Sequence, residues 1–318
     1  MKKFIIAVVI IIIVGVGAYF VVKSFSGKNV VTNDQNTVNN PAQSTSTSET
    51  AAKTPVYKQT GATPNLADMS VFATSIGKSV QGKDILAYTY GNGDTNILFV
   101  GGIHGGYEWN TVLVAYDLMG YLATNPSAIP ANIKVTVIPT LNPDGLAKVV
   151  NTDSGYFTQA DIPTPISNTI SGRFNANNVD LNRNFDCDWQ ANGVWQKKTV
   201  SGGTSAFSEP ESQAVENYIN SNKPAAVVVY YSSAGGVFSS SCHNGVSSET
   251  NTLTQTYANA SGYPAHESFD FYATTGDMVN WLAKMNIPAI SVLLTNHIDT
   301  EWAKNQAGVQ AILKYYSK

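Results

Sequence analysis

A histidine and a glutamate stand close together in a glycine-rich segment, His104-Gly-Gly-Tyr-Glu108. Catalytic zinc sites commonly bind the metal through two histidines and one glutamate, with a water molecule in the fourth position. The pair alone is weak evidence, because a histidine beside two glycines is more often a loop residue than a ligand. It predicts a metal site only if other parts of the chain point to the same chemistry.

A second polar segment carries two arginines and reads Gly172-Arg173-Phe-Asn-Ala-Asn-Asn-Val-Asp-Leu-Asn182-Arg183. Guanidinium groups suit bidentate binding of carboxylates, so two of them in one cleft would indicate an anionic group on the substrate. The alternative is an exposed, asparagine-rich loop with solvated arginines. The segment by itself leaves both interpretations open.

The elements that must position these side chains alternate between strands and helices. Apolar runs predict strands, and the last four are nearly continuous, as expected of central strands covered on both faces; the runs are 84–90, 96–100, 134–139, 225–231 and 289–294. Helical periodicity predicts helices at 110–123, 209–220, 249–260, 277–285 and 301–316. Ser208 and Glu211 have the spacing of a capping box. The alternation predicts an α/β fold whose polar loops meet at the carboxyl ends of the strands.

Taken together, these segments resemble the carboxypeptidase A family of zinc peptidases, the funnelins, from about Tyr57 to the C-terminus. Seven motifs occur in the order that the family has: Ser79 to Lys83, His104 to Trp109, Asn142-Pro-Asp-Gly145, Gly172-Arg173, Val179 to Phe185, Phe207 to Glu211, and Tyr272 to Gly276 with Trp281. The resemblance implies a mixed, largely parallel central sheet flanked by helices. It also implies a zinc cofactor and a peptide partner, with peptidoglycan stem peptides as one candidate.

The resemblance implies a role for each residue at the reacting centre. His104 and Glu108 would bind the zinc ion, and Arg173 would polarise the scissile carbonyl and stabilise its oxyanion. The family usually has two residues between the ligands, whereas this chain has three, of which two are glycines that can absorb the extra residue.

The same resemblance assigns the residues that bind the substrate. Asn182 and Arg183 would bind the C-terminal carboxylate of a peptide, and Tyr272 would close over the bound residue. Val279 would lie near the floor of the side-chain pocket and hints at an apolar terminal residue.

Two residues that the family relies on are missing. The third zinc ligand should be a histidine at the end of the predicted 225–231 strand, where this chain has Ser232, or Tyr231 if the loop is shifted by one. The general base should be a glutamate in the last strand, where this chain has Leu293. A general base contributes about 10²–10⁴-fold to the rate, so its loss alone is severe.

Other residues could replace the missing ones only by unusual geometry. His243 is a candidate third ligand, although ligand positions are normally set by rigid elements. Asp299 and Glu301 lie near the base position, but charges at a helix N-terminus explain them better. His266 and His297 match no role in the family and are expected to be loop residues.

Two functions therefore remain open. The first is a zinc metallocarboxypeptidase acting on peptide C-termini, including those of cell-wall peptides. The alternative is a pseudopeptidase that binds C-terminal carboxylates without hydrolysis, in which zinc binds weakly or not at all. The net charge of −3 and the pI of about 5.8 give no reason to expect a nucleic-acid partner.

The N-terminus predicts a membrane anchor over residues 1–25. Lys2 and Lys3 precede an uncharged apolar run over 4–22, which as a helix would span about 28 Å, close to the hydrocarbon thickness of a membrane. A cleaved signal peptide is the alternative, but its apolar region is usually about 7–15 residues long. The two lysines predict a cytoplasmic N-terminus and an extracytoplasmic globular domain on a single-pass membrane protein.

The remaining chain divides into a stalk and one domain. Residues 26–55 are rich in Ser, Thr and Asn and predict a flexible stalk, because such a segment cannot bury enough apolar surface to fold. Residues 56–318 predict the carboxypeptidase-like domain. Its two cysteines, Cys187 and Cys242, could pair in an oxidising compartment.

Overall fold

The computed structural model describes residues 72–318. The predicted membrane anchor, the predicted stalk and the start of the predicted domain lie outside the described residues. Within residues 72–318, no helix has both the length and the apolar character needed to cross a membrane.

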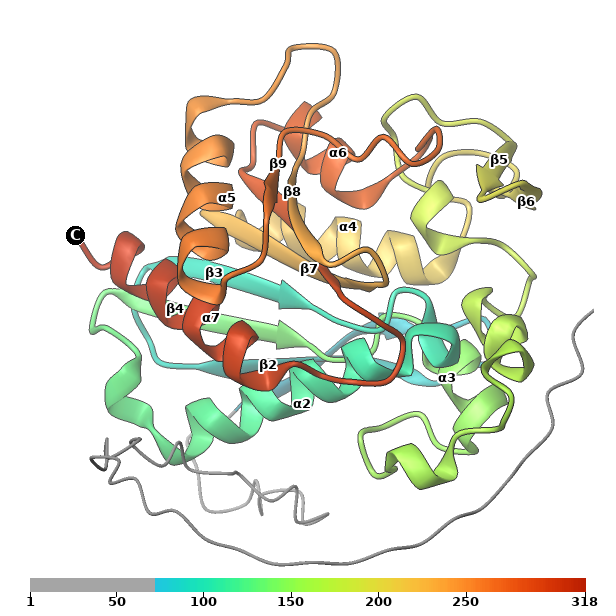
Figure 1. The fold of residues 1–318 in the computed structure, drawn as a ribbon, viewed down its shortest axis with the longest axis horizontal. Helices are drawn as coiled ribbons and strands as arrows, with labels where there is room; N and C mark the ends of the chain where they lie inside the picture. The colour runs from blue at the N-terminus through green and yellow to red at the C-terminus, as the bar shows by residue number, and fades with distance from the viewer. Residues whose placement is uncertain (1–71) are drawn as a thin grey trace, which may run out of the picture. The chain divides into compact units, whose positions relative to one another are not determined.

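An eight-stranded mixed sheet forms the centre of the fold (Figure 1), in the order β1-β2-β4-β3-β7-β10-β8-β9. Its central strands β4, β3, β7 and β10 are parallel, while β1 and β2 at one edge pair antiparallel with their neighbours. Near the other edge, β8 pairs antiparallel with β10 and parallel with β9. The bounds are β1 Phe72–Lys78, β2 Asp84–Tyr90, β3 Thr95–Val100, β4 Ile133–Ile138, β7 Ala226–Ser232, β8 Gly236–Ser239, β9 Ala265–His266 and β10 Ala289–Leu294. A separate hairpin pairs β5 (Asn192–Trp195) with β6 (Lys198–Ser201).

The central strands form where β-branched and other apolar residues are continuous. Every residue of β7 and β10 is buried, because helices cover the sheet on both faces. A polar residue within these strands therefore faces either the core or a cavity. Ser291 in β10 is one such residue.

Helices cover the two faces of the sheet (Figure 1). On one face, α2, α5 and α7 pack through side chains such as Leu118, Tyr257 and Val309. On the other face, α4 and α6 pack through side chains such as Val215 and Leu282. The bounds are α2 Trp109–Thr124, α3 Pro143–Val150, α4 Pro210–Asn222, α5 Ser248–Ser261, α6 Met278–Lys284 and α7 Trp302–Tyr316.

The mixed sheet, the five predicted strands and the five predicted helices are confirmed. Their observed ends differ from the predicted ends by at most two residues. The predicted capping box is wrong. Helix α4 begins at Pro210, Ser208 donates a hydrogen bond to Glu209 (2.9 Å), and Glu211 instead accepts one from the backbone N–H of Val80 (3.0 Å). The carboxylate of Glu211 thus binds the turn between β1 and β2 and does not cap its own helix.

A disulfide joins Cys187 to Cys242, a pairing that the sequence allowed and left open. Cys187 closely follows the arginine-containing segment, and Cys242 follows Ser241 just beyond β8. The bond therefore ties together two segments that are 55 residues apart in the chain.

The parallel strands β3, β7 and β10 are adjacent, so their carboxyl ends meet at one edge of the sheet. The segment with His104 follows β3, Ser232 ends β7, and Asn296 and His297 follow β10. Loops at the carboxyl ends of parallel strands are where α/β folds build ligand sites.

A half-buried carboxylate in α2, that of Asp117, makes the stability of this fold depend on pH. Burial raises the pKa of Asp117 to about 6, although Thr300 forms a hydrogen bond with it. The folded chain therefore holds the proton more tightly than the unfolded chain, and the stability from this group is lost as the pH rises through about 6. We expect Asp117→Asn to stabilise the full chain by about 1–3 kcal/mol at pH 8 and by little at pH 4.5, as measured by thermal unfolding. Asp94→Asn, at an exposed position, is the control, and an equal gain at both pH values would contradict the assignment.

Candidate active site

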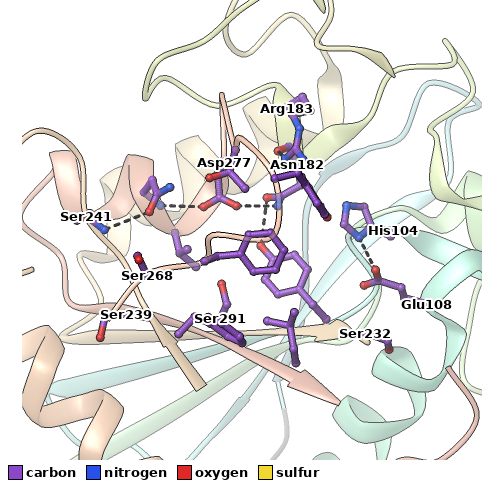
Figure 2. Close-up of a pocket in the computed structure, with 18 of the residues that line it drawn as sticks. His104, Glu108, Asn182, Arg183, Ser232, Ser239, Ser241, Ser268, Asp277 and Ser291 are labelled. Atoms are coloured by element: carbon purple, nitrogen blue, oxygen red, sulfur yellow. Dashed lines mark hydrogen bonds and ion pairs between the residues drawn. The ribbon is translucent and has the colours of Figure 1, made fainter. Parts of the chain in front are cut away.

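A pocket of about 190 Å³ opens at the carboxyl edge of the sheet (Figure 2). The structure brings together at this pocket every site residue that the sequence predicted, along with the residues at the two substituted family positions. They are His104, Glu108, Arg173, Asn182, Arg183, Tyr231, Ser232, Tyr272, Val279 and Leu293.

His104 and Glu108 face each other at one end of the pocket (Figure 2), with Nδ1 of His104 2.9 Å from Oε1 of Glu108. Both are buried, and a short 3₁₀ turn (η2, Gly105–Glu108) connects them. Gly105 has a φ of +44°, and a Cβ atom there would lie 2.7 Å from the carbonyl oxygen of Gly172. Only glycine suits this position, so the packing of the turn on Gly172 sets where Glu108 points.

Asp180 links His104 to Arg173. Its Oδ1 lies 3.3 Å from Nε2 of His104, and its Oδ2 accepts hydrogen bonds from Nη2 (2.7 Å) and Nε (3.0 Å) of Arg173. Burial alone would raise the pKa of Asp180, but Arg173 and His104 outweigh it and hold the pKa well below its usual range. Asp180 is thus a permanently charged carboxylate. The sequence reasoning gave it no role, although it lies within the Val179 to Phe185 motif.

Arg173 is held in one place by several contacts. Its guanidinium lies over the ring of Trp195, with the central carbon 4.5 Å from the ring centroid, and its Nη1 is 3.7 Å from Oε1 of Glu108. Burial lowers the pKa of Arg173, but Asp180 and Glu108 outweigh this and raise it. The charge is therefore fixed beside the pair of His104 and Glu108.

Two of the expected metal ligands fit a divalent cation. Oε2 of Glu108 is buried and has no hydrogen-bond partner within residues 72–318, and the two ring nitrogens of His104 face only carboxylate oxygens, those of Glu108 and Asp180. Asp180 faces Nε2 of His104, the kind of outer carboxylate that orients metal-binding histidines. Even so, among the described residues no three His, Cys, Asp or Glu side chains converge on one point.

The end of β7 offers no ligand of the usual kind. The hydroxyl group of Ser232 donates to Oδ1 of Asn110 (2.8 Å), and that of Tyr231 donates to Oδ1 of Asn182 (3.1 Å). The Tyr231 ring lies 5.7 Å from that of His104. Burial, with Asp277 and Glu108 adding to it, raises the pKa of Tyr231 well above its usual range, so the phenol keeps its proton.

The candidates for replacing the missing residues lie elsewhere or serve other contacts. His243 is exposed and pairs with Asp188 at 3.0 Å. Glu301 pairs with Lys304 at 2.7 Å and accepts hydrogen bonds from Thr295. Asp299 accepts a hydrogen bond from Asn296 (2.9 Å). None of these residues lines the pocket, where Leu293 presents hydrocarbon at the base position.

Asn182 and Arg183 lie next to each other on the pocket wall. The amide of Asn182 donates to Asp277 (2.8 Å) and accepts from the backbone N–H of Met278 (3.1 Å). The guanidinium of Arg183 donates through Nη1 to the carbonyl of Asn182 (2.7 Å) and through Nε and Nη2 to that of Val194 (3.3 and 2.9 Å). A guanidinium has five N–H groups, so one on Nη1 and one on Nη2 remain.

Arg183 carries a buried charge without a carboxylate in contact. It is 1% exposed, and within residues 72–318 no Asp or Glu oxygen lies within 4 Å of its nitrogens. The ring of Tyr272 lies 5.8 Å from its central carbon. Arg173, by contrast, has Asp180 as its partner.

The far end of the pocket carries both polar and apolar side chains. Val279, Phe238 and Phe269 line it. Ser241 and Ser268 line it too and lie opposite His104 and Glu108 (Figure 2), whereas the hydroxyl of Ser239 pairs with that of Thr254 in α5 (2.7 Å). Asp277 is the carboxylate nearest to this end. Burial raises its pKa, although hydrogen bonds and Arg183 partly oppose the rise. The apolar terminal residue expected from Val279 stays a prediction.

His297 lies beside the site, although no sequence motif predicted that position. Its ring lies 4.7 Å from that of Tyr107, which directly precedes Glu108. Burial lowers the pKa of His297, and Glu108 opposes this while His104 and Arg173 add to it. The imidazole is therefore neutral at neutral pH.

Comparison with known proteins agrees with this geometry. A family model described as zinc carboxypeptidase, Peptidase M14, matches residues 65–310. The chain belongs to the zinc carboxypeptidase family. Membership accounts for the motif order and for the convergence of the motifs on one pocket.

Two curated relatives illustrate the range of the family. The chain is 26% identical over 219 residues to γ-D-glutamyl-L-diamino acid endopeptidase 1 of Lysinibacillus sphaericus, covering 63% of this chain and 55% of that protein. It is 30% identical over 124 residues to human carboxypeptidase Z, covering 35% of this chain and 18% of that protein. The chain thus spans about half the length of the first relative and less than a fifth of the second.

Solved structures share the fold at low identity. Murein-tripeptide amidase MpaA from Escherichia coli O157 superposes with a TM-score of 0.55 at 22% identity, covering 76% of this chain and 90% of that one. Bovine thrombin-activatable fibrinolysis inhibitor superposes with a TM-score of 0.61 at 18% identity, covering 79% and 90%. At these identities the likeness concerns the fold alone.

The charge of Asp180 should be needed to hold Arg173 in the interior. Removing one partner of a buried ion pair leaves the other charge uncompensated, which costs about 3–5 kcal/mol. We expect Asp180→Asn to lower the free energy of unfolding of the full chain by that amount in denaturant titrations. Asp188→Asn, at the exposed pair with His243, should change it little. Equal effects from the two variants would refute the central place given to Asp180.

Proposed function

We propose that this protein is a zinc-dependent peptidase that binds the C-terminal carboxylate of a peptide through Arg183 and cleaves the bond next to the bound residue. The observation that carries the proposal is the buried guanidinium of Arg183, which lines the pocket and has N–H groups to spare. Buried charges in proteins are normally paired, because an isolated charge is expensive to desolvate. A substrate carboxylate would supply the missing partner.

The use of arginine in this chain supports the same conclusion. The whole sequence contains only two arginines, Arg173 and Arg183, and both line this pocket. The other cationic side chains are lysines, which bind as point charges, whereas a guanidinium binds both oxygens of a carboxylate at once. The free N–H groups on Nη1 and Nη2 of Arg183 are suited to that geometry.

The reacting centre would lie between the carboxylate site and the pair of His104 and Glu108. Arg173, fixed by Asp180 and Trp195, would stabilise negative charge that develops on the carbonyl oxygen. Zn²⁺ held by His104 and Glu108 would supply Lewis acidity and an activated water. Asp180 would keep the proton on Nε2 of His104, leaving Nδ1 as the ligand atom.

The wall beyond Arg183 favours a terminal residue with a polar side chain. Serine hydroxyls and Asp277 suit an amino or amide group better than a hydrocarbon one. One relative is named for a diamino acid peptide and one structural neighbour for a murein tripeptide, so we propose cell-wall stem peptides as the substrate class. The predicted N-terminal anchor and stalk would hold the domain outside the membrane, where such peptides occur.

A second candidate is a protein that binds these peptides without hydrolysing them. The specific observation in its favour is Leu293, which is 6% exposed and occupies the base position with hydrocarbon. Carboxylate binding by Arg183 is common to both candidates. Hydrolysis distinguishes them.

The first test concerns carboxylate recognition. We expect the full chain to bind a tripeptide ending in a diamino acid, and Arg183→Ala to weaken binding by about 10–100-fold, since a hydrogen bond to a charged group contributes about 1.5–3 kcal/mol. Isothermal titration calorimetry measures this directly. Lys284→Ala, which removes an exposed cation, is the control. Equal affinity of the wild-type chain for the free and the C-terminally amidated peptide would refute the proposal without relying on any variant.

The second test concerns hydrolysis. With zinc added, we expect slow, chelator-sensitive release of the terminal residue by the wild-type chain, and release about 10²–10⁴-fold faster in Leu293→Glu, because a carboxylate there would act as general base. Leu293→Gln, of similar shape but without a basic group, should not show the increase. If neither the wild-type chain nor Leu293→Glu releases amino acids while peptide binding persists, the second candidate stands.

A further inference from the structure

The hairpin of β5 and β6 contacts both arginines of the chain. Residues alternate between the two faces of a strand, and the buried residues of β5 are Gly193 and Trp195. The sequence contains only two arginines, Arg173 and Arg183. The buried face of β5 packs against the side chains of both, one at each of its two buried positions.

Trp195 packs on the guanidinium of Arg173. The central carbon of that guanidinium lies 4.5 Å from the centroid of the indole ring, a distance at which an aromatic face attracts a cation. Trp195 is buried, and the ring of Tyr107 packs edge-on against it at 5.1 Å between centroids. Asp180 binds the edge of the guanidinium through Nε and Nη2. The indole therefore supplies what the carboxylate does not, a surface that fixes the plane of the group.

The two residues before Trp195 hold Arg183. The carbonyl oxygen of Val194 accepts hydrogen bonds from Nε (3.3 Å) and Nη2 (2.9 Å) of Arg183. Gly193 leaves room for the same side chain, because a Cβ atom there would lie 2.7 Å from Cδ and 3.1 Å from Cγ of Arg183. A larger residue at position 193 would push Arg183 out of its place on the pocket wall.

Hydrogen bonds anchor the hairpin to the segment from Asp180 to Asn184, which carries Arg183. The carbonyl of Ser201, the last residue of β6, accepts from the backbone N–H of Asp180 (2.9 Å). The carbonyl of Gly202 accepts from the side-chain amide of Asn184 (2.7 Å). The base of the hairpin thus has a fixed position relative to the carboxylate that pairs with the other arginine.

We propose that the β5–β6 hairpin is the element that positions both arginines of the site. Trp195 sets the plane of the Arg173 guanidinium. Gly193 and the carbonyl of Val194 set the place of Arg183. The hairpin thereby fixes the spacing between the cation that binds the terminal carboxylate and the cation that faces the scissile carbonyl, and this spacing selects the bond next to the bound residue. Gly193 and Trp195 are positioning residues, and the inference rests on the proposed function.

The first test addresses Arg183, by isothermal titration calorimetry on the full chain. Gly193→Ala places a methyl group against the Arg183 side chain. We expect its affinity for a tripeptide with a free C-terminal carboxylate to fall about 10-fold, as overpacking of a filled site does, and its affinity for the C-terminally amidated peptide to stay within about twofold. Val194→Ala is the matched control, because its side chain lies on the exposed face of β5 and its carbonyl is retained.

The second test addresses Arg173 and needs no turnover. The probe is a peptide with a phosphonate in place of the scissile amide, whose anionic oxygen stands where the oxyanion would develop. We expect Trp195→Leu to weaken binding of the phosphonate about 10-fold more than binding of the parent peptide, since the aromatic face that aligns the guanidinium is lost. Trp195→Phe keeps an aromatic face and should stay within about threefold of the wild-type chain for both ligands.

The two tests separate positioning from a merely structural role. Equal affinities for wild type and Gly193→Ala, equal losses for its free and amidated peptides, or equal losses for phosphonate and parent peptide in Trp195→Leu would overturn the inference while the proposed function stands. A wild-type chain with equal affinity for the free and the amidated peptide would overturn the proposed function and the inference with it.

Discussion

The charge on Asp180 is the interaction on which the rest of the site depends. One carboxylate neutralises a fully buried guanidinium and also faces the outer nitrogen of a buried imidazole. Without it Arg173 could not remain in the interior, and His104 would have no fixed orientation. The turn that carries Glu108 packs against the segment that carries Arg173 at Gly172, so these four side chains form one unit.

A second set of buried carboxylates builds the frame beneath that unit. Asp144 accepts a hydrogen bond from the backbone of Gln81 (2.9 Å) and pairs with Lys83 (2.9 Å), while Glu211 accepts from Val80 (3.0 Å). Three of the motifs that carried the family resemblance are thus structural. They join the β1–β2 turn to α3 and α4, and none of their residues lines the pocket.

The sequence predicted the parts of the molecule that follow from local pattern. Continuous apolar runs predicted β7 and β10, because strands that are buried on both faces carry few polar residues. The order of the motifs predicted which residues meet at the site. It missed α3, since Asn142-Pro-Asp-Gly145 reads as a turn, and it misread Glu211 as a capping residue. The error at Glu211 arises because its partner, Val80, lies more than sixty positions away in the chain.

The same limit applies to the contacts of Asp180 and to the position of His297. Sequence neighbours reveal neither, because Asp180 meets His104 and Arg173, and His297 packs on Tyr107, only where strands and loops come together in the folded chain. For Asp180 a signal existed in its motif, between Val179 and Asn182. For His297 the only signal was its place four residues after Leu293, beyond the end of a strand predicted to be central.

The disulfide has a consequence for selectivity. Cys187 follows the carboxylate-binding segment and Cys242 follows Ser241 of the polar wall, so a covalent bond spans the two sides of the pocket. The segment after Tyr272 is tied to the same place, because Gly276 donates to the carbonyl of Cys187 (2.7 Å) and accepts from Phe185 (3.0 Å). A pocket braced in this way loses little conformational freedom when it is filled. The disulfide thereby limits how far the segment with Arg183 and the segment with Ser241 can move apart.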